Sequence, residues 1–285
     1  MSQFGQALFV KAANVLLTNP TLRKLIWRWS YDVFSNRARG SSWDFLNFGY
    51  VCDGLEGRPE LDADDEANRL CIQLYHLISR FVDVRGRQVL EVGCGRGGGS
   101  AYIAKYLGPT LITGIDLSEN AIRYCRQRHV GPNVSYQVGH AENVPFDDDR
   151  FDVVLNVESS HCYASVEKSF HEVARILKAG GTFFWADVNA ARNDDKRLTN
   201  VGSIAVPSTL KLVHEEDITP KVVQAMDLMN DERERKLVGM FPGVLRQGAL
   251  EDFGIKGSEF YRDMVAGRLV YLVRVYEKIP PRIFP

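Results

Sequence analysis

The stretch from Gln88 to Gly99 reads Q-V-L-E-V-G-C-G-R-G-G-G and holds the residues best suited to bind a ligand. A short apolar run that ends abruptly in glycines is typical of a buried strand that turns into a tight loop. Gly93, Gly95 and Gly98 fit the spacing G-x-G-x-x-G. Such glycines let a ligand approach the backbone closely, and the N–H groups of the helix that follows favour a polar or anionic ligand. Glu91 adds a carboxylate just before this loop.

Two kinds of ligand compete for this loop. A dinucleotide would place its pyrophosphate on the glycines and a ribose on Asp116, an acid about 20 residues further on. The Glu91 carboxylate would then repel the phosphates, whereas it would attract an ammonium or sulfonium group. Asp116 can accept hydrogen bonds from a ribose diol, and Ala141 with Glu142 suits an adenine amino group. These residues together predict S-adenosylmethionine as the ligand. The alternative is that Glu91 has a purely structural role and ties the loop or caps a helix.

Alternating strands and helices are expected to position these residues. Strands are predicted over 88–92, 110–115, 134–138, 151–156 and 182–186, and helices over 67–82, 99–107, 118–129 and 166–177. Nearly continuous apolar strands in this order predict a Rossmann-like α/β fold, a mostly parallel sheet with helices on both faces. Ligands bind at the carboxyl ends of such strands, where Asp116, residues 156–161 and Asp187 follow.

The last third of the chain departs from this alternation. Residues 219–238 have a helical pattern, while 253–261 and 268–277 are predicted as an antiparallel hairpin that completes a seven-stranded sheet. We therefore predict four regions. They are an N-terminal helical arm and lid (1–60), an S-adenosylmethionine-binding core (61–188), a helical substrate cap (189–250) and C-terminal strands of the core sheet (251–285).

Composition and charge limit the partners of the protein. The 285 residues carry a formal net charge of −1, which does not favour a nucleic acid partner. The five cysteines are spread out and show no C-x-x-C spacing, which argues against a disulfide framework or a structural zinc ion and favours a reducing compartment. No apolar run approaches the length of a membrane span. These features predict a cytoplasmic protein without a metal site.

The first 60 residues contain two apolar stretches, 4–17 and 21–34, followed by a polar and aromatic segment, 37–60. Basic residues do not precede the apolar part and no cleavage site is evident, so a signal peptide is not predicted. The two stretches are either amphipathic helices packed on the body or on a partner subunit, or a lid that contacts a membrane surface weakly. Self-association into a homo-oligomer stays open, and the polar segment is either a packed connection or a ligand clamp.

Four segments follow one another in the order L-E-V-G-C-G-R-G-G-G, G-I-D-L-S, G-H-A-E-N-V-P-F-D-D-D-R-F-D-V-V and V-A-R-I-L-K-A-G-G. Together they resemble the motifs of class I S-adenosylmethionine-dependent methyltransferases over residues 48–187. V-L-N-V-E-S-S-H-C-Y, N-F-G-Y and the final G-x-L-x-Y-x-x-x-x-Y are similar to phthiotriol/phenolphthiotriol dimycocerosate O-methyltransferases and related small-molecule and sterol-type enzymes. His140 departs from the aspartate usual in the family.

This resemblance implies a cofactor site, which would release S-adenosylhomocysteine as product. Asn47, Gly49 and Tyr50 would close over the methionine end, while the loop glycines would approach the methionine and ribose. The remaining expected contacts are Asp116 with the ribose, Leu117, Ala141 and Glu142 with the adenine, and Asn156 and Val157 near the sulfonium.

Methyl transfer is an in-line displacement that depends on orienting the nucleophile in a dry site. An alcohol must lose its proton as it attacks, and a histidine suits that task. His161 is the candidate base, with Glu158 orienting it or binding substrate and Asp187 nearby. The alternative is that His161 only caps a helix or packs on the cofactor. Cys162 is expected to pack rather than react.

The acceptor must be judged from the segments expected to close the pocket, the N-terminal helices and residues 189–244. Both supply Phe, Trp, Leu and Met rather than charge, which favours a lipophilic acceptor such as a polyketide lipid, a terpenoid or another secondary metabolite. The favoured reaction is O-methylation. The alternatives are C-methylation of a prenyl or sterol-like double bond through a carbocation, lined by aromatic faces, and a non-catalytic cofactor-binding relative.

Overall fold

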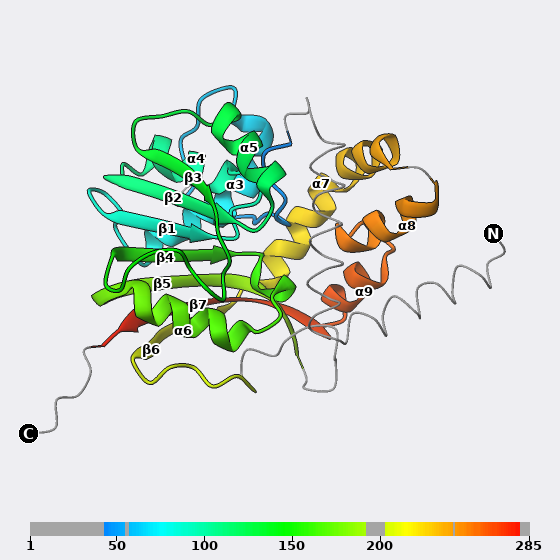
Figure 1. The fold of residues 1–285 in the computed structure, drawn as a ribbon. Helices are drawn as coiled ribbons and strands as arrows, with labels where there is room; N and C mark the ends of the chain where they lie inside the picture. Colours follow the sequence, from blue (N-terminus) through cyan, green and yellow to red (C-terminus); the bar gives the residue numbers. More distant parts are fainter. Residues whose placement is uncertain (1–42, 55–56, 192–202, 242, 280–285) are drawn as a thin grey trace, which may run out of the picture.

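A computed structural model describes residues 43–54, 57–191, 203–241 and 243–279 of this chain. The helices predicted over 4–17 and 21–34 lie outside these residues. Seven strands form one sheet in the order β3-β2-β1-β4-β5-β7-β6 (Figure 1). The strands are β1 (Gln88–Val92), β2 (Leu111–Asp116), β3 (Val134–Val138), β4 (Phe151–Val157), β5 (Leu177–Ala190), β6 (Leu210–Asp217) and β7 (Leu269–Lys278).

The predicted α/β architecture is confirmed. The neighbouring pairs among β1 to β5 are parallel, while β7 is antiparallel to β5 and β6 is antiparallel to β7. The described helices are α3 (Arg69–His76), α4 (Gly98–Tyr106), α5 (Glu119–Arg128), α6 (Val166–Ile176), α7 (Thr219–Met240), α8 (Gly243–Asp252) and α9 (Glu259–Val265), with short 3-10 turns at 66–68, 77–80 and 160–162. Because the carboxyl ends of parallel strands meet at one edge, the residues that follow β1, β2 and β4 are brought together.

One predicted strand is wrong. Residues 253–261 do not pair in the sheet, because Gly254 and Gly257 take positive φ angles and Ser258 caps α9 by accepting a hydrogen bond from the Tyr261 N–H at 3.1 Å. The edge strand that pairs with β7 is instead β6. Its K-L-V-H-E-E-D sequence is mostly exposed, as suits an edge strand, so it lacks the apolar pattern of the inner strands. The division into four regions stays a prediction, and β6 falls within the range assigned to the cap.

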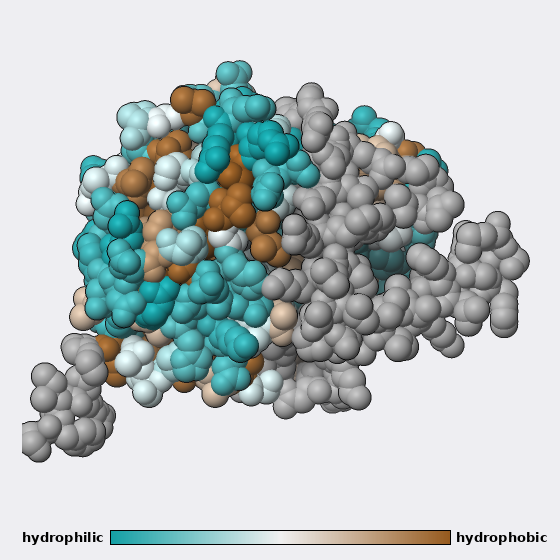
Figure 2. Space-filling view, in the orientation of Figure 1, coloured by the Kyte–Doolittle hydropathy of each residue, from teal (hydrophilic) through white to brown (hydrophobic). Residues whose placement is uncertain are grey.

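Two hydrophobic clusters cover the two faces of the sheet. On one face, side chains of α3, α4, α7 and α9 pack on Val89, Leu155 and Val273, among others. On the other, α6 packs on Leu90 and Phe183. The outward side of α6 is largely hydrophilic (Figure 2), and α7 to α9 lie together at one end of the sheet (Figure 1). Among the described helices, none is long and apolar enough to cross a membrane.

Candidate active site

The glycine loop after β1 makes a close turn that admits no side chain at Gly93. Its φ is +78°, and a Cβ added there would lie 2.3 Å from Oγ of Ser159. The N–H of Gly93 donates to the carbonyl of Ile115 at 2.8 Å, which ties the loop to the end of β2. Gly98 opens α4, and a Cβ there would meet the carbonyl of Asp44 at 2.7 Å. Packing within the protein therefore requires glycine at these two positions, because Ser159 and Asp44 occupy the space that a side chain would need.

Glu91 is fully buried in β1, and both of its oxygens are used within the protein. The Tyr75 hydroxyl donates to Oε1 at 2.7 Å, and the Ser100 hydroxyl donates to Oε2. Burial raises the pKa of Glu91 to about 7, although the bonds from Ser100 and Tyr75 oppose that rise. Glu91 thus ties α3 and α4 to the sheet, which is the structural alternative weighed from the sequence, and it also places negative charge under the glycine loop.

Asp116 lies at the carboxyl end of β2, where its carboxylate meets the glycine loop. Oδ2 accepts from the N–H of Gly95 at 3.0 Å and Oδ1 from the N–H of Ser118 at 2.8 Å. Leu117, beside it, is partly buried. This arrangement fixes the carboxylate next to the loop, as a ribose-binding residue requires.

Glu142 is committed to the protein itself. Its Oε1 accepts from the N–H groups of Ala164 and Ser165, at 2.9 and 3.1 Å, just before α6. Its own N–H donates to Nδ1 of His140 at 3.0 Å. Ala141 is partly buried beside it. The structure therefore places Glu142 as a tie between two loops, and the sequence did not indicate this use of its carboxylate.

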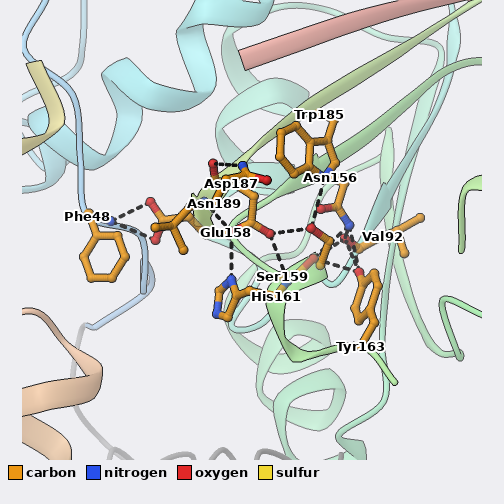
Figure 3. Close-up of polar contacts among 12 residues, drawn as sticks. Phe48, Val92, Asn156, Glu158, Ser159, His161, Tyr163, Trp185, Asp187 and Asn189 are labelled. Atoms are coloured by element: carbon orange, nitrogen blue, oxygen red, sulfur yellow. Dashed lines mark hydrogen bonds and ion pairs between the residues drawn. The ribbon is translucent and has the colours of Figure 1, made fainter. Parts of the chain in front are cut away.

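Asn156 is buried at the end of β4, close to the glycine loop (Figure 3). Its amide nitrogen donates to the hydroxyl of Tyr163 at 2.7 Å and to Oγ of Ser159 at 2.9 Å. Its Oδ1 is buried and has no hydrogen-bond partner among the described residues. An acceptor left over in this way suits an ammonium donor of a bound ligand. Val157, the next residue, packs in the core.

His161, in the 3-10 turn that follows β4, pairs with Asp187 (Figure 3). The sequence predicts Asp187 just after its strand, but β5 continues to Ala190, so Asp187 lies within it. Nδ1 of His161 lies 2.7 Å from Oδ1 of Asp187, whose Oδ2 accepts from the Ser160 hydroxyl at 2.6 Å. Burial alone would lower the pKa of His161, but Cys162 and the Asp187 carboxylate raise it well above its ordinary value. Burial opposes ionisation of Asp187, yet His161 and the donors around it lower its pKa. A carboxylate on Nδ1 leaves Nε2 as the basic nitrogen of the ring.

Glu158 follows β4 in a strained conformation, with φ at +49°. Its carboxylate accepts from the N–H of Phe48 at 2.8 and 3.0 Å (Figure 3). Burial, followed by the charge of Asp187, raises its pKa to about 8, while the Phe48 N–H, Tyr271 and His161 lower it. Glu158, His161 and Asp187 therefore lie near one another, and among the described residues it is Asp187, not Glu158, that hydrogen-bonds the His161 ring.

A segment that we call the strap, residues 43–51, crosses this end of the sheet. Asn47 stabilises it by donating to the carbonyl of Cys71 at 3.2 Å and accepting from the N–H of Gly49 at 3.0 Å. Gly49 has φ at +78°, and a Cβ there would lie 2.5 Å from Met229 of α7. The Tyr50 side chain is buried, and its pKa is raised by burial and then by Glu216 of β6. The Tyr50 hydroxyl thus lies near Glu216 of β6.

Several residues of this site were missed by sequence reasoning. They are Tyr75, Ser100, Ser159, Tyr163, Arg233 and Tyr271. Ser100 directly follows the glycines, and Tyr271 lies in the final motif, so both carried a local signal. The Tyr271 hydroxyl is buried without a hydrogen-bond partner among the described residues, and the Glu158 and Asp187 charges add to burial in raising its pKa.

Comparisons with known proteins identify the class. Residues 90–185 match the methyltransferase domain family. The cyclase SpnF shares the fold with a TM-score of 0.67 at 18% identity, over 89% of this chain and 95% of that one. Geranyl diphosphate C-methyltransferase from Streptomyces coelicolor, solved with S-adenosylhomocysteine, has a TM-score of 0.61 at 17% identity, over 87% and 98% of the two chains. The fold is that of class I methyltransferases, and the protein is an S-adenosylmethionine-dependent methyltransferase.

Curated relatives narrow the class to a family. Phthiotriol/phenolphthiotriol dimycocerosates methyltransferase from Mycobacterium tuberculosis is 37% identical over 256 residues, which cover 90% of this chain and 93% of that protein. A fatty-acid O-methyltransferase from Mycolicibacterium smegmatis is 38% identical over 224 residues, covering 79% of this chain and 78% of that protein. This chain belongs to the family of the phthiotriol/phenolphthiotriol dimycocerosates methyltransferases.

The residues at the site fit the methyl donor. The glycine loop lies at the carboxyl end of β1, where ligands bind in this fold, the fixed carboxylate of Asp116 suits a ribose, and the spare oxygen of Asn156 suits an ammonium group. Glu91 contributes negative charge in the low-dielectric interior, where it favours a cation nearby. Among the described residues, no group of three or more His, Cys, Asp and Glu side chains is arranged to hold a metal ion.

Proposed function

We propose that this enzyme transfers the methyl group of S-adenosylmethionine to a hydroxyl of a lipophilic small molecule, such as a polyketide lipid, a terpenoid or another secondary metabolite. The names of its relatives support a lipid acceptor, because they are methyltransferases of phthiotriol dimycocerosates and of fatty acids. The observation that carries the proposal is the pairing of His161 with Asp187 at 2.7 Å beside the glycine loop.

His161 removes the proton of the acceptor hydroxyl as the oxygen attacks. Asp187 holds the ring through Nδ1 and stabilises the imidazolium that forms, as a carboxylate does in other histidine-based sites. Bound S-adenosylmethionine supplies the electrophilic methyl group. Its binding residues in this proposal are Asn47, Gly49, Tyr50, Glu91, Gly93, Gly95, Gly98, Asp116, Leu117, Ala141, Glu142, Asn156 and Val157.

A labelling experiment tests this proposal. The purified protein is incubated with S-adenosylmethionine labelled in its methyl group and a host lipid extract, and the labelled product is characterised by mass spectrometry and NMR. We expect an O-methyl ether. In His161→Ala, turnover should fall by about a hundredfold or more while S-adenosylhomocysteine still binds in calorimetry. His171→Ala, at an exposed position of α6, is the matched control and should keep its activity.

Three results would contradict the proposal. A methyl group on carbon would favour the route through a carbocation. A methyl ester formed equally well by His161→Ala would indicate an ionised carboxylate acceptor, which needs no general base. Failure of the protein to bind S-adenosylmethionine or S-adenosylhomocysteine would indicate a non-catalytic relative.

A further inference from the structure

The peptide group between Asn47 and Phe48 is held on both sides by charged side chains. Its carbonyl oxygen accepts a hydrogen bond from Nη2 of Arg233, on α7. Its N–H donates to both carboxylate oxygens of Glu158, at 2.8 and 3.0 Å. A single peptide of the strap therefore bridges a cation of the cap helix and an acid of the proposed site.

Arg233 has no acidic partner of its own among the residues that the structure describes. Its side chain is only 6% exposed. Besides the Asn47 carbonyl, it contacts the Cys71 sulfur at 3.6 Å, and its Nη1 is buried without a hydrogen-bond partner within the described part of the chain. A guanidinium stays charged when buried, and a buried charge is costly unless it is compensated. The strap peptide offers its carbonyl oxygen to Arg233, and its N–H, at the opposite end of the peptide dipole, points to the Glu158 carboxylate.

Glu158 lies among several groups that can gain or lose a proton. Asp187 opposes the negative charge of Glu158, whereas His161 and Tyr271 favour it. That charge in turn contributes to raising the pKa of Tyr75 and of Cys71. Of the groups that favour the carboxylate, the N–H of Phe48 has the largest effect. Loss of the strap peptide would therefore leave Glu158 strained, buried and more easily protonated.

We infer that Arg233 is a positioning residue that, through the Asn47–Phe48 peptide, fixes Glu158 against the strap and couples the cap helix α7 to the assembly of the site. Arg233 touches neither the acceptor nor the methyl donor in this inference. It acts because a charge-assisted bond to the carbonyl holds the peptide where its N–H meets the carboxylate. The inference rests on the proposed role of Glu158 in the site, but its structural part is testable without any turnover.

Hydrogen exchange of the strap is the direct test. We expect Arg233→Met to lower the protection of the strap amides by about tenfold or more while the strands keep theirs, because one buried charge-assisted bond is lost. Arg233→Lys should restore part of that protection. Arg235→Met is the matched control on the same helix, since Arg235 is exposed and, within the described part of the chain, donates to the carbonyl of Asp231. It should change nothing in the strap.

The pathway from Arg233 to Glu158 is tested by a double-mutant cycle. Glu158→Gln alone should also lower the protection of the strap amides. The double variant with Arg233→Met should show little less protection than the less protected of the two single variants, because both side chains act through one peptide. Strap protection in the wild type should fall as pH drops below about 8, the pKa of Glu158. In Arg233→Met this midpoint should move to higher pH.

Additive losses in the cycle, or an unchanged strap in Arg233→Met, would overturn the inference. A uniform rise in exchange over the whole sheet would also overturn it, because that would assign Arg233 to general stability. These exchange results do not depend on methyl transfer. An inactive protein with a coupled strap would therefore contradict the proposed function alone.

Discussion

Two buried glutamates frame this site, and they are held in different ways. Glu91, under the glycine loop, receives hydroxyls from α3 and α4 and lies within a regular strand. Glu158, beside His161, receives one backbone N–H from the strap and has a positive φ. Burial raises the pKa of both, to about 7 and about 8.

The difference shows which glutamate is held by the core and which is held by the strap and α7. The Glu91 carboxylate itself is held by core elements, although the strap also reaches the glycine loop, where the Gly98 N–H donates to the Asp44 carbonyl at 3.3 Å. The Glu158 side is complete only when the strap and α7 lie against it. We call the surroundings of Glu91 and the glycine loop the donor side, and those of Glu158 and His161 the acceptor side. The anchor of Glu91 uses no strap residue, whereas the anchor of Glu158 does.

The largest expected effect is on the acceptor side, in Asp187→Asn. The amide cannot hold His161 in the tautomer that Asp187 imposes, so turnover should fall by about a thousandfold. S-adenosylhomocysteine affinity should change little, because among the described residues the Asp187 carboxylate hydrogen-bonds Ser160, His161 and Val188 and not the glycine loop. Turnover and calorimetry on the same preparation check this. An equal loss of affinity would show that the two sides are not separate.

On the donor side, Gly93→Ala should abolish most cofactor binding. The new methyl group would collide with Ser159 and the residue would have to keep a φ of +78°. Gly180→Ala is the matched control, because Gly180 has φ of +75° with no atom within 4 Å of an added Cβ. The control should lose only about 1–2 kcal/mol of unfolding free energy from backbone strain. Calorimetry and thermal unfolding separate the two variants, and equal behaviour would contradict a close-packed loop.

The pH dependence of turnover should also distinguish the acceptor side from the donor side. His161 must be neutral to act as base, and its pKa is raised, so turnover should increase as pH rises above neutrality, by about tenfold per unit at most. In Asp187→Asn this limb should move to lower pH. The contribution of His161 to the stability of the fold should change in the opposite direction and decrease as pH rises. The raised pKa of His161 stabilises the fold below its unfolded value of about 6.5, and this contribution is lost as pH rises through the folded value.

The lowered pKa of Asp187 has the opposite linkage. It stabilises the fold above the unfolded value, near 3.8, and that stability is lost as pH falls through the folded value. Unfolding measured over this range in the wild type and in Asp187→Asn checks both signs. A pH–rate profile without this rise in turnover above neutrality would contradict the proposal that His161 is the general base.

The smallest expected effect comes from a pair of tyrosines. Tyr75 donates to Glu91, so Tyr75→Phe should cost about 1–3 kcal/mol of unfolding free energy by leaving a buried acceptor unpaired. The Tyr271 hydroxyl lies close enough to Glu158 to lower the pKa of that carboxylate, but it has no partner within hydrogen-bond geometry among the described residues. Tyr271→Phe should therefore leave the melting temperature nearly unchanged. A drop in turnover of about tenfold or less without loss of stability would assign its hydroxyl to the acceptor side. Comparable melting losses in both variants would contradict the comparison of the two glutamates.

Much of the fold could be predicted because its signals are local. The apolar strands and the glycines after β1 each depend on a few neighbouring residues, and both are confirmed. The missed strand β6 shows the limit of such signals. Its partner β7 lies more than fifty residues away, so its pairing leaves little trace in its own mostly polar sequence.

The class of reaction could be predicted from the sequence, because the donor side consists of short motifs at successive strand ends that parallel pairing must bring together. The use of the acidic residues, in contrast, depends on contacts between distant parts of the chain. Phe48 meets Glu158 across 110 residues, and Arg233 meets Asn47 across 186. The tertiary structure also turned Glu142 toward the start of α6 and Tyr50 toward β6. Such contacts depend on where the strap and cap pack, and no local pattern of residues records that.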